Sequence, residues 1–177
     1  YGEQLVLNDV SFDVPKGEIF VILGGSGCGK TTLLKHMTGL LTPTSGQVYY
    51  SGTDITILDE DQLSRVQQHI GIAFQSGALF NSLTVGENVA LPMREYTEME
   101  EDLIEATVLL KLSLVGLASA KDLLPEQLSG GMRKRAGLAR AIALDPPIVY
   151  FDEPSAGLDP IMASGLDELI LDLKRLL

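Results

Sequence analysis

The nine residues 24–32 constrain this chain more than any other stretch. They read Gly-Gly-Ser-Gly-Cys-Gly-Lys-Thr-Thr and lie between the apolar run 19–23 and a helix-like segment that starts at Leu33. This is the pattern G-x-x-x-x-G-K-[ST] in a strand–loop–helix context. Glycines let successive N–H groups point into one concavity, and the following helix adds the positive end of its dipole. The pattern therefore predicts a phosphate cradle, and the alternative is a flexible turn between a strand and a helix.

Two side chains of this loop carry chemistry. Lys30 would place its charge on the β- and γ-phosphates of a nucleotide, and the Thr31 hydroxyl would complete the coordination of a bridging Mg²⁺. The residues expected to bind the nucleotide are Gly24, Gly25, Ser26, Gly27, Cys28, Gly29, Lys30, Thr31 and Thr32.

Composition narrows the function classes. The chain has 177 residues, 13 basic against 24 acidic, and a formal net charge of −11. This length predicts one domain, with or without an inserted subdomain. The acidic balance argues against a nucleic-acid partner, because affinity for phosphate backbones comes from clustered Lys and Arg. The single cysteine, Cys28, excludes an internal disulfide and suits a reducing compartment. No apolar run reaches membrane-spanning length and no signal peptide opens the chain, so we expect a soluble protein or one held at a membrane by partners.

The two ends suggest a fragment. The sequence opens at Tyr1 rather than Met, and it closes inside a helical pattern that runs from Met162 to Leu177 without a cap. A crossover helix should lead into another parallel strand, so at least one strand is expected to be missing.

Periodicity predicts an α/β pattern with a helical interruption. Residues 4–14 alternate like one or two half-buried antiparallel strands, whereas 19–23 and 70–74 are typical of buried parallel strands, and 148–154 is typical of a buried strand that ends in two carboxylates. A polar helix is expected over 59–68, with Asp59 as N-cap, and an amphipathic helix with an acidic start over 98–117. The change of texture from residue 76 to about 124 indicates a helical insert.

A second anion-binding element is predicted at residues 128–132. Ser129 fits a helix N-cap, and Gly130 and Gly131 leave backbone amides open at the start of a helix over 133–144. A simple capped helix start is the alternative. The basic residues of this helix are expected to form a solvated or ion-paired face; they are Arg133, Lys134, Arg135 and Arg140.

Polar residues follow two of the predicted buried strands. Gln75 comes after one, where α/β proteins place ligand contacts, although a solvated loop residue is an equal alternative. Asp152 and Glu153 come after another, where the first would hold the hydration shell of Mg²⁺ and the second would orient or deprotonate the attacking water. The alternative for this pair is a helix cap or a solvated loop. Asp159, just ahead of Pro160, is expected to cap the last helix.

The ordered set of motifs resembles the ABC-transporter ATPases over the whole chain. Residues 128–132, Leu-Ser-Gly-Gly-Met, look like the signature sequence of that family and lie between the phosphate loop and Phe-Asp-Glu-Pro at 151–154. The resemblance implies an α/β fold: a P-loop NTPase (RecA-like) core with an antiparallel β subdomain and an inserted α-helical subdomain. It implies a single, C-terminally truncated nucleotide-binding domain over 1–177, with core and β subdomain at about 1–75 and 145–177 and helical subdomain at about 76–144.

The same resemblance implies roles for the ambiguous positions. Tyr1 matches the aromatic residue that stacks on adenine, with an ordinary chain-end aromatic as the alternative. Gln75 and Glu153 match catalytic positions, and Asp159 matches the loop that crosses the dimer interface. ATP and Mg²⁺ are the implied cofactors, with the metal at Thr31, Gln75 and Asp152. In a head-to-tail homodimer the signature of one chain would close over the ATP of the other; its residues are Leu128, Ser129, Gly130, Gly131 and Met132.

Within the family, the chain is similar to the ATPase subunit of Mce/Mla-type bacterial phospholipid transporters. The similarity lies in residues 75–80, the Gly-Gly-Met signature and residues 138–144. It implies permease subunits and an Mce-type lipid-binding subunit as partners, no nucleic acid, and a peripheral place on the cytoplasmic face of the inner membrane. Three alternatives stay open: a subunit for another substrate, a soluble ABC ATPase without a transport role, and a nucleotide-binding module without catalysis.

The chain departs from the family pattern at three places. Met132 stands where many members have Gln, and Gly157 adds one residue to the loop before Leu158. The switch histidine of the family is absent, and neither His36 nor His69 matches its position; His36 is expected to pack or to form a hydrogen bond on the first helix. The resemblance therefore implies a fragment that binds ATP better than it hydrolyses it.

Overall fold

The structure is a computed structural model that describes residues 5–176. The chain divides into two compact units, with the boundary between Gln67 and Gln68. Tyr1, the predicted adenine-stacking residue, lies outside the described residues.

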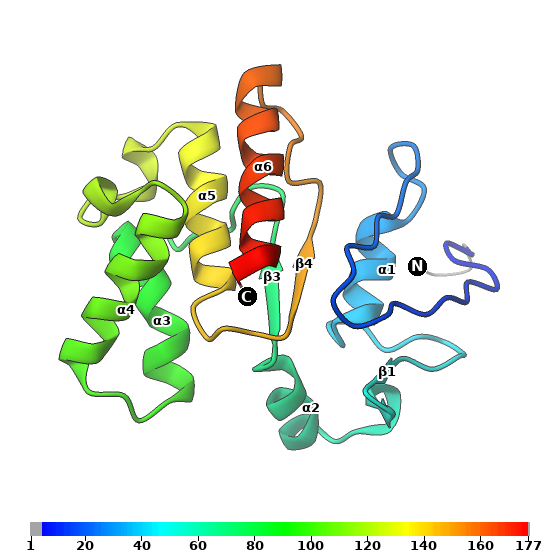
Figure 1. The fold of residues 1–177 in the computed structure, drawn as a ribbon. Coiled ribbons are helices and arrows are strands. Elements are labelled where there is room, and N and C mark those ends of the chain that lie inside the picture. The colour runs from blue at the N-terminus through cyan, green and yellow to red at the C-terminus, as the bar shows by residue number, and fades with distance from the viewer. Residues whose placement is uncertain (1–4, 177) are drawn as a thin grey trace. The chain divides into compact units, whose positions relative to one another are not determined.

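The N-terminal unit contains two short helices and a small hairpin (Figure 1). Its elements are α1 (Lys30–Met37), β1 (Tyr49–Tyr50), β2 (Thr53–Asp54), a 3-10 turn at Ile55–Ile57, and α2 (Glu60–Gln67). β1 and β2 pair antiparallel, Tyr49 with Asp54 and Tyr50 with Thr53. Ser51 and Gly52 connect them with φ of 50° and 87°, the left-handed conformation that two-residue hairpin turns require.

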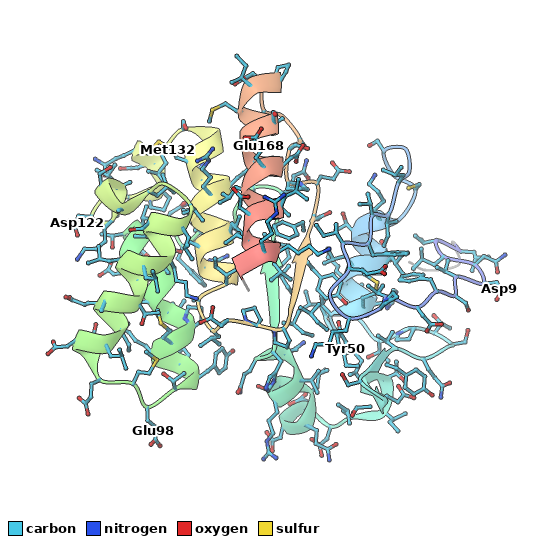
Figure 2. All side chains as sticks on the ribbon, in the orientation of Figure 1. Asp9, Tyr50, Glu98, Asp122, Met132 and Glu168 are labelled. Carbon is cyan, nitrogen blue, oxygen red and sulfur yellow. The ribbon has the colours of Figure 1, made fainter. Side chains whose placement is uncertain are left out.

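Local signals fix the ends of α1 and α2 as the sequence predicts. Gly39 follows α1 with φ 72°, and its N–H donates to the carbonyl of His36 at 3.2 Å. Asp59 caps α2, because its Oδ1 accepts the N–H of Gln62 at 2.8 Å. The Nδ1 of His36 lies 2.9 Å from the carbonyl oxygen of Leu41, which confirms the expected hydrogen bond. The Tyr50 hydroxyl, labelled in Figure 2, donates to the Met37 carbonyl at 2.6 Å and ties the hairpin to α1.

The prediction of strands over 4–14 and 19–23 is wrong for the described residues. Residues 5–48 contain no strand, and Val21 and Leu23 are 66% and 87% exposed. The chain does turn at 15–18 as expected, with the Glu18 N–H donating to the Pro15 carbonyl, and the rings of Phe12 and Phe20 stack at 4.9 Å. A strand forms only where a neighbouring strand accepts and donates its backbone hydrogen bonds, and the described residues of this unit supply none for these segments.

The C-terminal unit is a parallel strand pair covered by helices (Figure 1). Its elements are β3 (Ile70–Ala73), α3 (Val85–Tyr96), α4 (Glu101–Leu114), two 3-10 turns (Ala118–Ala120 and Pro125–Gln127), α5 (Gly130–Ala141), β4 (Ile148–Phe151) and α6 (Pro160–Leu176). β3 and β4 run parallel, with Ile70 opposite Ile148 and Ala73 opposite Phe151. The predicted helix over 98–117 is α4, three residues shorter at each end. In the described residues no helix is both long and apolar enough to cross a membrane.

One face of the strand pair carries the core of this unit. Gly71 and Ala73 are buried, and Val149 and Phe151 pack against the cluster formed by α3, α4, α5 and α6. A Cβ atom on Gly71 would lie 2.3 Å from the Ala141 carbonyl oxygen, so only glycine allows α5 to approach β3 so closely. Contrary to the prediction, β4 is not fully buried, since Ile148 on the opposite face is 37% exposed. The core helices of this unit pack on the face that carries Val149 and Phe151.

Candidate functional site

The phosphate loop ends in a helix N-terminus, as the pattern predicts. Gly29 precedes α1 with φ 98°, and Gly27 has φ 76°, so the backbone turns through conformations that favour glycine. Position 24 also requires glycine, because a Cβ atom there would lie 2.4 Å from the Cys28 sulfur. The loop from Gly24 to Cys28 is exposed to solvent. An exposed amide-lined turn at a helix start is what a phosphate chain requires.

The Lys30 ammonium lies over this loop. Its Nζ donates to the carbonyl oxygens of Gly24 and Gly25, both at 3.0 Å. These two carbonyls hold the Lys30 charge beside the glycine-rich loop. The residues present in the N-terminal unit therefore fit a phosphate group, and Thr31, on the first turn of α1, is placed next to them in sequence.

In the C-terminal unit, the predicted catalytic segments meet at one edge of the strand pair. Because β3 and β4 are parallel and in register, Gln75 and Asp152 both follow the carboxyl ends of neighbouring strands. The Asp152 N–H donates to the Ala73 carbonyl at 3.0 Å, which extends the pairing to the acidic residues. Asp152 is 8% exposed, whereas Gln75 and Glu153 are exposed. A buried carboxylate beside an exposed one at a strand end suits a metal-holding group beside a group that meets water.

The second predicted anion element has the expected cap. Ser129 precedes α5, and its hydroxyl accepts the N–H of Met132 at 3.2 Å. Ser129 and Gly130 are exposed, and Met132 lies at the same end of α5 (Figure 2). The predicted N-cap is confirmed for α5, which begins at Gly130 rather than at Arg133.

Asp159 caps the last helix as predicted. Its Oδ1 accepts the N–H groups of Ile161 and Met162 at 3.1 and 3.0 Å, and Pro160 occupies the first helical position. Asp159 is exposed, so this capping role leaves the loop accessible.

The basic side chains of α5 are half-buried rather than fully solvated, and they meet backbone carbonyls. All four cationic side chains donate to backbone carbonyls: Arg133 to Leu128, Arg135 to Val115, Lys134 to Pro154 and Ala156, and Arg140 to Gly77 and Ala78. Loops that pack on α5 supply these carbonyls and leave each side chain partly exposed, so the expected solvated face is met only in part. Charge spacing along one helix carries no information about which loops pack on it.

Arg140 anchors the segment that follows Gln75. Its guanidinium donates to the carbonyls of Ala78 at 2.9 Å and Gly77 at 3.1 Å, and it lies 5.9 Å from the ring centroid of Phe80. Burial lowers the pKa of the Arg140 guanidinium, which still remains charged because an arginine pKa lies far above neutrality. Gly77 and Gly137 allow the closest approach, since a Cβ on Gly137 would lie 2.8 Å from the Gly77 Cα.

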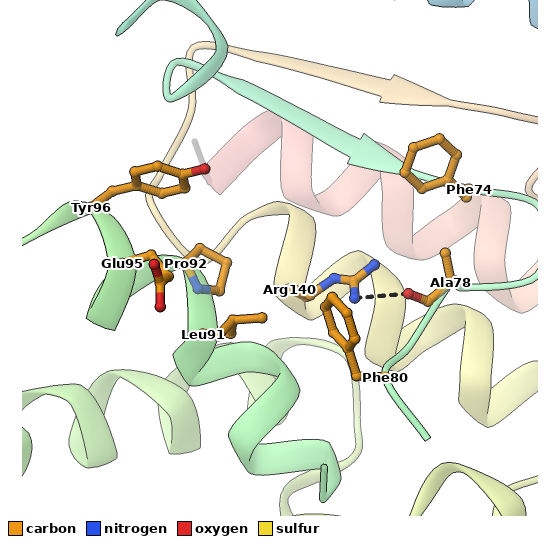
Figure 3. A pocket seen from close by; sticks show the side chains of 8 residues that line it. All are labelled: Phe74, Ala78, Phe80, Leu91, Pro92, Glu95, Tyr96 and Arg140. Atoms are coloured by element: carbon orange, nitrogen blue, oxygen red, sulfur yellow. Dashed lines mark hydrogen bonds between the residues drawn. The ribbon is translucent and has the colours of Figure 1, made fainter. Parts of the chain in front are cut away.

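A groove of about 360 Å³ opens beside this anchor (Figure 3). The rings of Phe74 and Phe80 and the side chain of Tyr96 border it, and Arg140 and Glu95 bring the two charged groups. Its full lining is Phe74, Ala78, Phe80, Leu91, Pro92, Glu95, Tyr96 and Arg140. Phe80 and Tyr96 are 54% and 53% exposed, which makes the groove an accessible apolar surface.

Comparison with known sequences decides the family. Residues 7–156 match the family described as ABC transporter. The chain belongs to the ABC transporter family. Among relatives, it is 47% identical over 176 residues to the intermembrane phospholipid transport system ATP-binding protein MlaF of Haemophilus influenzae, covering 99% of this chain and 67% of that protein. It is 45% identical over 173 residues to the probable ribonucleotide transport ATP-binding protein mkl of Mycobacterium leprae, covering 98% of this chain and 50% of that protein.

Solved ABC structures share the fold. The dimeric post-hydrolysis state of the ATP-binding cassette MJ0796, bound to ADP and Pi, superposes with a TM-score of 0.90 at 33% identity and covers 98% of this chain and 78% of that one. CbiO1 of Clostridium perfringens, part of the transporter complex cbiONQ, superposes at 0.85 with 30% identity, over 96% of this chain and 67% of that one. The chain therefore has the predicted α/β P-loop NTPase fold of ABC ATPases. It spans about half to two thirds of the length of the curated relatives it matches.

Sequence reasoning missed three side chains that organise these ABC motifs. Lys134 and Arg140 stand in the sequence as ordinary basic residues, and Asn88 stands in a helix without any motif. Asn88 is fully buried and bonds to both backbone groups of Phe80. An asparagine next to the apolar run 89–91, within the predicted helical insert, is the one signal that could have drawn attention to it.

Proposed function

We propose that this chain is the ATP-binding and ATP-hydrolysing part of an ABC transporter that moves phospholipid across the bacterial envelope. The observation that carries the proposal is the phosphate loop with Lys30 over its carbonyls, in a chain 47% identical to a phospholipid transport ATP-binding protein. Phosphoryl transfer needs little more than fixed positive charge, a metal ion and an oriented water.

The roles of the site residues follow the motif order. Residues 24–32 bind the triphosphate, with Lys30 as the point charge and Tyr1 stacked on the adenine. Thr31, Gln75 and Asp152 hold Mg²⁺, which would neutralise charge that develops on the phosphates. Glu153 orients or deprotonates the attacking water, since an exposed carboxylate at a strand end is open to it.

Dimerisation is part of this proposal. The residues 128–132 end in an exposed, capped helix start that is separate in sequence from the phosphate loop, and the solved cassette MJ0796 is dimeric. Head-to-tail pairing would bring the signature of one chain to the γ-phosphate of the other, with Asp159 in the loop at the interface. In the proposed domain organisation, the core and β subdomain comprise residues of about 1–75 and 145–177, and the helical subdomain comprises residues of about 76–144.

The groove beside Phe80 is proposed to receive a helix of the permease. Its lining is mostly apolar, includes the two charged residues Glu95 and Arg140, and adjoins the segment of Gln75. A short amphipathic helix with an apolar stripe and one acidic residue toward Arg140 would complement it. A permease and an Mce-type lipid-binding subunit would hold the protein at the cytoplasmic face of the inner membrane, with no nucleic acid involved.

A second candidate substrate is a ribonucleotide, since the Mycobacterium leprae relative is named for its transport. Both substrates require the same ATPase and differ in the permease. Affinity purification of the full-length protein from detergent-solubilised membranes separates them, because it identifies the permease and the molecule bound to it. Recovery of a permease with phospholipid supports the first candidate, and recovery without any membrane protein favours a soluble ABC ATPase.

The catalytic assignment is tested by Glu153→Gln in the full-length protein. We expect ATP binding within a factor of two of wild type and turnover lowered by about a thousandfold, since the substitution keeps the shape and removes the base. A matched control is Glu168→Gln on α6, which makes the same change on the exposed face of a helix. Undiminished hydrolysis in Glu153→Gln would refute the assignment.

A further inference from the structure

Lys134, on α5, reaches the loop that contains Glu153. Its Nζ donates to the carbonyl oxygens of Pro154 at 2.7 Å and Ala156 at 2.5 Å, and lies 3.5 Å from that of Glu153. A lysine ammonium has three donors and no acceptor, so three converging carbonyls match its hydrogen-bonding capacity. One side chain of α5 thus contacts three residues of the loop that follows β4.

The loop itself needs such an anchor. Glu153 has φ 47°, a left-handed conformation that a residue with a side chain adopts only where its surroundings hold it. Two turns follow at once, with the Ala156 N–H donating to Glu153 at 3.1 Å and the Leu158 N–H to Ser155 at 3.2 Å. These local bonds leave the carbonyls of Pro154 and Ala156 for Lys134.

Two opposing effects act on the Lys134 charge. Burial lowers the pKa of the Lys134 ammonium, and the nearby Glu153 carboxylate acts in the opposite direction. A charged donor bound to carbonyls forms stronger hydrogen bonds than a neutral one. Replacing the ammonium by an apolar end would leave these carbonyls without their charged partner.

We propose that Lys134 is a positioning residue that holds the backbone of Glu153 in its left-handed turn and ties it to the helix that begins at the signature. The catalytic consequence rests on the proposed role of Glu153. Because α5 starts at Gly130, with Ser129 as its N-cap, contact of the partner's phosphate with that helix start would be transmitted, through Lys134, to the glutamate of the same chain.

The experiment compares Lys134→Met, Lys134→Arg and a control, Lys174→Met, in the full-length protein. Lys174 is an exposed lysine on α6, so its replacement makes the same chemical change away from the loop. We expect Lys134→Met to lower kcat for ATP about ten- to hundredfold with KM within about twofold, because charged hydrogen bonds are lost while the phosphate loop is untouched. Lys134→Arg should keep kcat within about threefold, and Lys174→Met should match wild type.

Amide hydrogen exchange of the peptide 152–159 tests the anchor without reference to catalysis. Lys134→Met should speed exchange of the Ala156 and Leu158 amides about tenfold, and the arginine and control variants should not. Unchanged exchange in Lys134→Met, or a kcat equal to wild type, would overturn the proposal. So would equal losses in the methionine and arginine variants. Lys134→Gln, which keeps one amide donor, replaces Lys134→Met if that variant does not fold. If Glu153→Gln retained turnover, the catalytic consequence would fall, whereas the exchange result would still decide whether Lys134 holds the loop.

Discussion

Asn88 offers a sharp test of how the segment after Gln75 is held. Its side chain is 0% exposed and lies under the loop 80–84. The Oδ1 accepts the Phe80 N–H at 2.8 Å, and the Nδ2 donates to the carbonyls of Phe80 and Leu83 at 3.1 Å and of Thr84 at 2.9 Å. The perturbation is Asn88→Ala, which removes all four bonds and leaves only a small void.

The magnitude follows from which groups keep a partner. The Phe80 carbonyl still accepts the Leu83 N–H at 3.2 Å, and the Thr84 carbonyl still accepts the backbone N–H of residue 88 at 2.9 Å. The Phe80 N–H and the Leu83 carbonyl lose the bonds that Asn88 supplies. An unsatisfied buried polar group costs about 1–3 kcal/mol, and the exposure of Phe80 admits some water to this loop. We therefore expect a loss of about 2–4 kcal/mol in the free energy of unfolding.

The assay is urea denaturation followed by far-UV circular dichroism, with equal slopes required for a comparison of free energies. Asn81→Ala is the matched control, since it is the same substitution at an exposed residue of the loop 80–84. It should change the free energy of unfolding by less than about 0.5 kcal/mol. Asn88→Asp should also be destabilising, because a carboxylate would face three carbonyls that need a donor. A loss in Asn88→Ala no larger than in Asn81→Ala would refute the reasoning.

Two further predictions concern the same region. Gly137→Ala should lower the free energy of unfolding by about 1–3 kcal/mol, because the new Cβ would lie 2.8 Å from backbone atoms of Gly77. This loss is expected although alanine favours helices. A gain in stability measured by urea denaturation would contradict the prediction. Phe80→Glu should abolish co-purification of the full-length protein with its permease and leave ATP affinity unchanged, because a carboxylate in the apolar groove costs desolvation energy on docking. Leu109→Glu, a similar change on the exposed side of α4, should still co-purify with the permease. If Phe80→Glu also retained the permease, the groove would be ruled out as the docking surface.

The sequence alone determined the features that depend on neighbouring residues. The caps at Asp59, Ser129 and Asp159, the turn at 15–18 and the glycine-rich loop before α1 all lie where local patterns predict them. Such features involve a few consecutive residues, so their physical cause is present in the sequence itself. The order of the motifs was likewise enough to predict the ABC family.

Tertiary structure decided what depends on distant partners. Apolar runs at 19–23 and 148–151 look alike in the sequence, but only the second finds a hydrogen-bonding neighbour strand among the described residues. Lys134 and Arg140 look alike on one helix, yet one binds the loop after Glu153 and the other the segment after Gln75. The packing of loops that are distant in sequence decides which carbonyls a basic side chain contacts. Helical periodicity carries no information about that packing.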